Sequence, residues 1–93
     1  MALARGADAR ERRQRVEQIR ARLDRLSARE RNVLDRVVLG WMNRQIAEDL
    51  AITERTVKFH RANLMDKMGA GSVAELARMV ESAGSWADSP SAD

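Results

Sequence analysis

The sequence has 93 residues, of which 33% are charged and 44% hydrophobic, the length and balance of one small globular domain. It contains no cysteine, which excludes disulfides, thiol nucleophiles and cysteine-based zinc sites and is typical of a reducing compartment such as the cytoplasm. The longest apolar run, residues 37–42, is too short to span a membrane or to form a signal-peptide core, so we expect no membrane partner.

The positive charge is concentrated at the N-terminal end. Residues 1–26 contain eight arginines against four acidic residues, whereas residues 27–82 contain nine basic residues against eight acidic ones. Any nucleic-acid binding by the second segment must therefore depend on which helix face carries its cations, because its net charge is close to zero.

The residue patterns predict an all-α protein. Proline occurs once, at Pro90, and no segment alternates apolar and polar residues over the length of a strand. In the arginine-rich segment, residues 1–26, a linker helix is predicted. From residue 8 to residue 26 its apolar positions are spaced three, four and three residues apart and form a narrow stripe: Val16, Ile19, Leu23 and Leu26. Such a stripe can pack on the helix's own domain or form a short coiled-coil dimer, and the spacing leaves both open.

Four helices are predicted in residues 27–82 from start and stop signals. Ser27 and Glu30 form a capping box, and the helix that they begin ends at Gly40. Asn43 is expected to cap a short second helix over residues 44–50.

The remaining signals place two more helices and a tail. Thr53 can cap a third helix that runs to about residue 68 and ends before two glycines. Ser72 and Glu75 form a second capping box for a fourth helix over about residues 73–82, and residues 83–93 are predicted to be a disordered tail. The apolar residues expected in the core are Leu34, Val37, Ile46, Leu50, Val57, Leu64, Val73, Leu76 and Val80.

The second and third helices are predicted to form a helix-turn-helix over about residues 43–67. Only three residues separate them, with Ile52 in the corner of the turn. A rotation of 100° per residue places Val57, Leu64 and Met68 of the third helix on one face, with His60 on its flank. The opposite face carries Arg55, Lys58, Phe59, Ala62 and Asn63, and Thr56 lies beside it.

This outer face has the residue types that recognise DNA. Cations bind phosphate, an amide can read base edges, and an aromatic ring or a small alanine can contact a thymine methyl group. The alternative is an ordinary exposed face that includes one phenylalanine.

Several motifs in succession resemble the LuxR-type helix-turn-helix domain. They are LSARERNVL, the stop at Gly40, NRQIAEDL, ITERTVKFHRANLMDKMGA and SVAELARMV, and together they cover residues 26 to about 80. Within that group, the sequence is most similar to the effector domain of NarL/FixJ-type two-component response regulators. It departs from the family pattern at Arg44, where lysine is usual, and at Met42, where many members have a small or hydroxyl residue.

The resemblance implies a bacterial transcriptional regulator whose third helix, about residues 54–68, enters the major groove. Its Thr-Val-Lys segment matches Thr56, Val57 and Lys58, and we expect Thr56 and Lys58 to contact DNA while Val57 lies in the core. With the outer-face residues, the expected DNA-binding set is Arg44, Thr53, Arg55, Thr56, Lys58, Phe59, Ala62 and Asn63.

The resemblance also implies that the fourth helix mediates dimerisation on inverted DNA half-sites. Its outer face carries Ala74, Arg78 and Glu81, although an ordinary solvated face fits this pattern equally well. RNA polymerase is a further implied partner, as is a receiver domain with a phosphorylatable aspartate. Residues 1–26 leave no room for a receiver, so the sequence is either an excised effector domain with its linker helix or a natural single-domain member. The abrupt arginine-rich start after Met1 favours the excised domain.

Neither catalysis nor a metal or other cofactor is expected. His60 is the single histidine and lies beside the core stripe, and the glycines at 69 and 71 end a helix instead of forming a phosphate-binding loop. Two other functions remain open: a sigma-factor-like promoter-binding domain, which generally lacks such a fourth helix, and a helical protein-interaction module that does not bind DNA. RNA binding is disfavoured because exposed aromatic residues are too few.

Overall fold

The computed structural model describes residues 2–84, with side chains from residue 8 onward, and these residues form helices and connecting turns without a strand. This confirms the predicted all-α class. The predicted tail beyond residue 84, which includes Trp86 and Pro90, lies outside the described residues. The helices are α1 (Ala2–Asp24), α2 (Ala28–Val38), α3 (Asn43–Leu50), α4 (Glu54–Met68) and α5 (Val73–Ser82).

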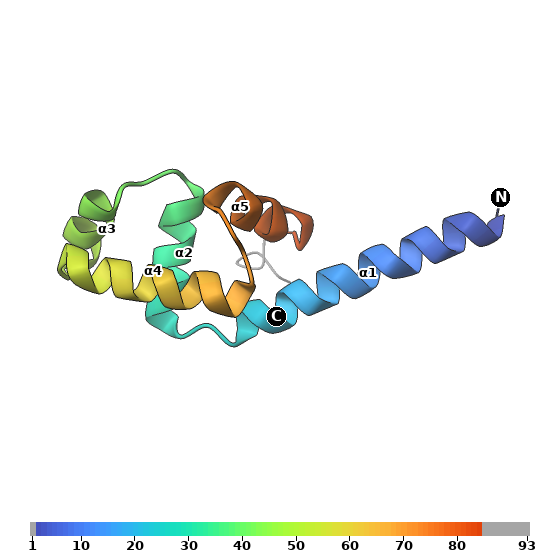
Figure 1. Ribbon diagram of the computed structural model, residues 1–93, viewed down its shortest axis with the longest axis horizontal. Helices are drawn as coiled ribbons and strands as arrows, with labels where there is room; N and C mark the ends of the chain where they lie inside the picture. Colours follow the sequence, from blue (N-terminus) through green and yellow to red (C-terminus); the bar gives the residue numbers. More distant parts are fainter. Residues whose placement is uncertain (1, 85–93) are drawn as a thin grey trace, which may run out of the picture.

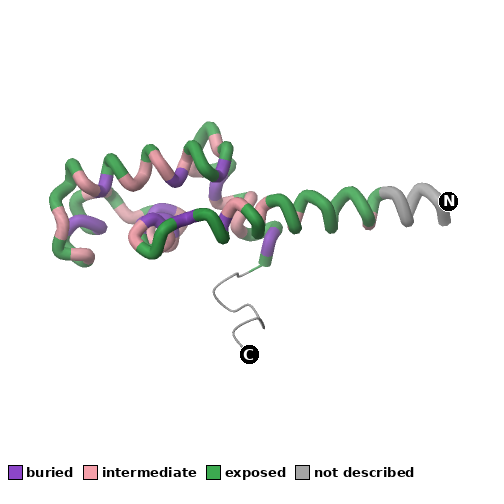
Figure 2. Tube along the Cα trace, turned by 90° about the horizontal axis from the view of Figure 1, so that it is seen from below, coloured by how far each residue is buried: buried purple, intermediate pink, exposed green. Residues whose placement is uncertain are grey.

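Helices α2 to α5 form a compact bundle, and α1 extends away from it (Figure 1). Helix α4 packs against both α2 and α3, and α5 packs against α2. The C-terminal half of α1 contacts α4 and α5, whereas the other half projects from the domain, and most of residues 8–15 are exposed (Figure 2).

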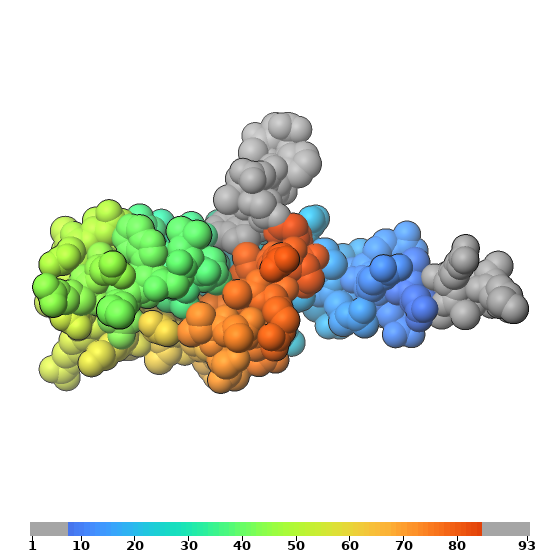
Figure 3. Space-filling view, turned by 90° about the horizontal axis from the view of Figure 1, so that it is seen from above, coloured from blue at the N-terminus to red at the C-terminus, as the bar shows by residue number. Residues whose placement is uncertain are grey.

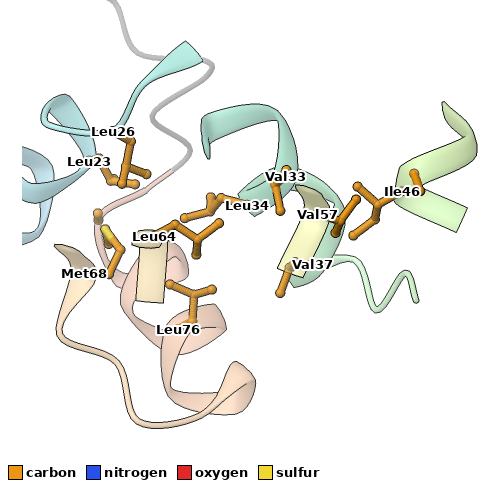
Figure 4. Packing of buried hydrophobic residues seen from close by; sticks show 12 residues of the cluster. Leu23, Leu26, Val33, Leu34, Val37, Ile46, Val57, Leu64, Met68 and Leu76 are labelled. Atoms are coloured by element: carbon orange, nitrogen blue, oxygen red, sulfur yellow. The ribbon is translucent and has the colours of Figure 1, made fainter. Parts of the chain in front are cut away.

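The core is made by apolar residues contributed by all five helices and their connections (Figure 4). Six of the nine predicted core residues are buried, and Leu50, Val73 and Val80 lie half-buried at its edge. In the part of the chain whose side chains are described, the buried apolar residues are Leu23, Leu26, Val33, Leu34, Val37, Ile46, Ala47, Val57, Leu64, Met68, Leu76 and Ala83.

Three predicted N-caps are present in the structure. The hydroxyl groups of Ser27, Thr53 and Ser72 each accept a hydrogen bond from the backbone N–H three residues later. At Ser27 the capping box is complete, because Oε1 of Glu30 accepts from the Ser27 N–H at 2.8 Å. Gly69 ends α4 in the left-handed conformation, with φ at +68°, as the stop signal predicts.

Two local predictions are wrong. Asn43 does not cap α3 but is its first residue; the N–H of Met42 donates to Oε1 of Gln45 at 2.8 Å instead. The second capping box is incomplete, because Oε1 of Glu75 accepts from the N–H of Gly71 at 2.6 Å and not from that of Ser72. At α3, Gln45 binds the N–H of the N-cap residue, and at α5, Glu75 binds the N–H one residue before the N-cap.

The C-terminal half of the linker helix packs on its own domain. Leu23 and Leu26 are 1% and 5% exposed and belong to the core, with Val16 and Ile19 packed against it. At the other end of the chain, Ala83 is 1% exposed, so the segment predicted as a tail begins with a core residue.

Candidate nucleic-acid interface

The helix-turn-helix holds α4 at one edge of the domain. Figure 3 shows α4 along this edge, between α3 at its N-terminal end and α5 at its C-terminal end. Val57, Leu64 and Met68 are each 0% exposed and anchor one face of α4 in the core, as the helical spacing predicts. The opposite face is therefore fixed toward solvent.

The predicted DNA-binding residues of α4 lie together on that outer face. Arg55, Lys58 and Ala62 are exposed, and Asn63 is half-buried. Phe59 is 63% exposed, one of the few large apolar side chains that are, and its ring meets His60 edge-on at 5.6 Å between centroids. The face thus offers cations, an amide and an aromatic ring within two to three turns of one helix.

The turn before α4 presents hydroxyl groups and backbone N–H groups. Oγ1 of Thr53 accepts from the Thr56 N–H at 3.1 Å and lies 2.9 Å from Oγ1 of Thr56, so the two hydroxyl groups share a hydrogen bond. Arg44 is exposed in the first turn of α3. Helix N-termini favour anions, so these positions suit phosphate groups beside a groove.

The angle between α3 and α4 is fixed by a hydrogen bond that the sequence analysis missed. Nη1 of Arg61 donates to Oδ1 of Asn43 at 2.8 Å and ties the middle of α4 to the first residue of α3. These residues are 18 positions apart, and no local pattern pairs them. The amide expected to cap α3 therefore holds the helix-turn-helix together.

A second link crosses from α2 to α3. Arg36 donates to Asp49 at 2.7 Å and to the carbonyl of Asn32 at 2.7 Å, and its guanidinium lies 5.7 Å from the centroid of the Trp41 ring. This arginine links α2 to the last turn of α3.

An ion pair between a buried glutamate and an exposed lysine links the other end of α4 to α2. Glu30 is 5% exposed, and its Oε1 accepts from Nζ of Lys67 at 2.7 Å as well as from Ser27. Burial alone would raise the pKa of Glu30, but the bonds from Lys67 and Ser27 outweigh it and leave the pKa below its ordinary value. The carboxylate therefore stays charged and links the start of α2 to the last turn of α4.

The residues predicted for dimerisation lie on the outer face of α5. Ala74, Arg78 and Glu81 are all exposed, whereas Leu76 on the inner face is 0% exposed. This surface carries a small residue and both signs of charge, but no large apolar group.

The described side chains contain no group of three or more histidine, aspartate or glutamate residues suited to hold a metal ion. Within the same part of the chain, no helix combines the length and apolar character needed to cross a lipid bilayer. The polar groups at the surface of α3 and α4 can bind and recognise a charged ligand.

Comparison with known proteins decides the family. The family model described as "Bacterial regulatory proteins, luxR family" matches residues 24–80, which begin at the end of α1 and include α2 to α4 and most of α5. The chain belongs to this family. Its helix-turn-helix is thus a LuxR-type DNA-binding domain.

The sequence relatives are response regulators and transcriptional regulators. The chain is 56% identical over 66 residues to the transcriptional regulatory protein FixJ of Rhizobium meliloti, covering 71% of this chain and 32% of that protein. It is 52% identical over 56 residues to the tetrathionate response regulatory protein TtrR of Salmonella typhimurium, covering 60% and 27%. The chain therefore spans about a third of the length of these relatives.

Two solved structures share the fold. Full-length FixJ from B. japonicum matches with a TM-score of 0.77 and 37% identity, over 89% of this chain and 41% of that one. The response regulator StyR matches with a TM-score of 0.70 and 42% identity, over 84% and 38%. The match to FixJ exceeds the family region, so it includes part of α1 or of the C-terminal segment. The domain is consistent with the output domain of a transcriptional regulator of this kind.

Proposed function

We propose that this domain binds double-stranded DNA sequence-specifically, with the outer face of α4 in the major groove. The observation that carries the proposal is the division of α4: three fully buried residues on one face, and an exposed Phe59 among the cations Arg55 and Lys58 on the other. A major groove about 12 Å wide admits one α-helix, and those side chains are suited to its floor and walls.

The outer face divides into base-reading and phosphate-binding positions. Lys58, Phe59 and Ala62 face the groove floor in this arrangement, and Arg55 and Asn63 lie at its margins as contacts to bases or phosphates. Thr53, Thr56 and Arg44 are assigned to phosphates because they lie at helix N-termini.

Selection of binding sites from random duplexes with the purified protein tests the proposal directly. We expect one enriched sequence, bound more tightly than its scrambled version in fluorescence anisotropy over a salt series. Arg44→Ala should weaken both duplexes alike and lower the salt slope by about one, because one phosphate contact is lost. No enrichment, with equally weak binding of both duplexes at low salt, would instead favour a protein-interaction module.

We assign dimerisation on DNA to the outer face of α5. Arg78 and Glu81 can pair across a two-fold axis, and the small Ala74 permits close approach. This patch is smaller than the ~800 Å² per partner of a stable dimer, so the free protein should be monomeric or weakly associated.

The dimer is tested with duplexes that contain one half-site or two inverted half-sites about one helical turn apart. Cooperative binding of two copies is expected on the paired site and is expected to be lost in Arg78→Glu, which places like charges opposite each other. Equal affinity per half-site on both duplexes would contradict the α5 interface.

The relatives also suggest the wider setting of the domain. We infer that it is the non-catalytic output domain of a bacterial two-component response regulator, works in the cytoplasm under the control of a receiver domain, and acts on RNA polymerase. The support is similarity to FixJ, TtrR and StyR, two of which are named as response regulators and one as a transcriptional regulator.

A further inference from the structure

Two arginines of α1 lie on opposite sides of its apolar stripe. Leu23 is buried and Ile19 is packed against the core, so this stripe faces the domain. At 100° per residue, Arg20 lies beyond one edge of the stripe and Arg22 beyond the other. The two side chains therefore extend toward different helices, one toward α5 and the other toward α4.

Each guanidinium ends on a backbone carbonyl at a helix C-terminus. Nη1 of Arg22 donates at 2.8 Å to the carbonyl of Met68, the last residue of α4. Nε and Nη2 of Arg20 donate at 3.1 and 3.0 Å to the carbonyl of Ala83, the C-cap of α5. Carbonyl groups at a helix C-terminus lack intrahelical partners and attract cations, so both contacts are favourable.

The glycine that ends α4 leaves room for the guanidinium of Arg22 in its present position. A Cβ atom at Gly69 would lie 2.8 Å from Nη1 of Arg22, too close for a carbon atom and a nitrogen atom. Gly69 thus serves two purposes, because it takes the left-handed conformation and leaves room for the guanidinium.

We propose that Arg20 and Arg22 are positioning residues for DNA recognition. We call these two arginines and their contacts with the carbonyls of Met68 and Ala83 the arginine clamp. Through the clamp, α1 fixes the C-terminal end of α4, which is proposed to enter the groove, and that of α5, which is proposed to dimerise. The inference rests on the proposed function. It assigns to α1 a role in specificity, and a partner that shifts the projecting half of α1 would change DNA affinity through the clamp.

The test compares Arg22→Ala and Arg20→Ala with Arg13→Ala. Arg13 is a matched control because it is exposed on the projecting half of α1 and makes no hydrogen bond or ion pair within the described residues. Each variant is titrated onto the selected operator and its scrambled version, at a temperature where circular dichroism shows it to be fully folded.

The clamp variants should lose specificity, the ratio of operator affinity to scrambled-duplex affinity. If the two arginines only stabilised the fold, this ratio would be unchanged in fully folded protein. We expect Arg22→Ala to bind the operator with an affinity at least about fivefold lower than that of Arg13→Ala, which is the lower end of typical coupling between two sites. The two variants should bind the scrambled duplex about equally. The salt slope should match that of the control. Arg22→Lys should recover most of the affinity because one nitrogen suffices, whereas Arg20→Lys should recover less because two nitrogens donate to one carbonyl.

Amide hydrogen exchange gives a readout without DNA. Exchange in the last turn of α4, residues 65–68, should be faster in Arg22→Ala than in Arg13→Ala. The proposal is overturned if Arg22→Ala equals the control in both DNA binding and amide exchange. It is also overturned if the salt slope of Arg22→Ala is lowered by about one, because that result assigns Arg22 to a phosphate contact. A wild-type protein that selects no duplex instead overturns the proposed function, and the exchange data then decide separately whether the clamp orders α4.

Discussion

At the scale of single residues, Glu30 joins two parts of the domain. Its buried carboxylate completes the capping box of α2 and pairs with Lys67 of α4, so one charged group stabilises a helix start and a contact between helices. A buried carboxylate stays charged only where such partners replace water, which is why its pKa lies below the ordinary value. Stability should therefore depend on its ionisation.

The pH dependence of unfolding tests this role. Because the pKa of Glu30 is lower in the folded state, its contribution is fully present above the unfolded-state value and is lost as the pH falls through the folded-state value. At pH 7, Glu30→Gln should lower the free energy of unfolding by about 1–3 kcal/mol, measured with urea. The difference from the wild type should shrink on acidification below about pH 4.5; a constant difference down to pH 3 would contradict the ion pair.

Phe59 and Lys58 should affect DNA binding in different ways. Lys58→Ala is expected to weaken operator binding by about 1–3 kcal/mol, with a smaller loss on scrambled DNA. Phe59→Ala should relax the preference at a thymine position and leave the salt slope unchanged, because the ring carries no charge. Anisotropy on operator variants over a salt series measures both effects. Equal losses on operator and scrambled duplexes would show that this face does not read sequence.

At the scale of helices, the sequence predicts what depends on neighbouring residues. The hydroxyl caps, the glycine end of α4 and the division of its faces follow from spacings of a few residues, and the structure has them. The bond from Arg61 to Asn43 joins residues 18 positions apart, and the clamp of Arg22 on Met68 joins residues 46 apart. Such pairs depend on tertiary packing, which a local pattern does not contain. The residues around Asn43 therefore predicted a helix cap and not its bond to Arg61.

The buried face of α4 should dominate the stability of that helix. Leu64 is 0% exposed, and Leu64→Ala should cost about 2–5 kcal/mol through the cavity that it leaves. Phe59→Ala on the exposed face is the control and should cost less than about 1 kcal/mol, although it removes a larger side chain. Urea unfolding followed by circular dichroism measures both values. Similar costs for the two variants would contradict the assignment of the faces.

At the scale of the whole molecule, α1 is part of the folded domain. Its apolar spacing is compatible with a coiled coil or with intramolecular packing, because both place one narrow stripe in contact. Only the tertiary structure shows that α4 and α5 leave room for Leu23 and Leu26 and provide carbonyl groups for the two clamp arginines. The domain boundary predicted at residue 27 therefore divides the core.

Two truncations test where the domain begins. Removal of residues 2–14 takes away the projecting part of α1, of which residues 10–14 are all exposed. The melting temperature should stay within a few degrees of that of the full chain. Removal of residues 2–26 also takes away two buried leucines, each worth about 1.5–3 kcal/mol. The sum is comparable with the roughly 5 kcal/mol that holds a small domain folded, so the shorter chain should be largely unfolded at 37 °C in a circular-dichroism melt. If both truncated chains melted like the full chain, the packing of α1 would contribute nothing to the fold, and Leu23 and Leu26 would be free for a coiled-coil partner.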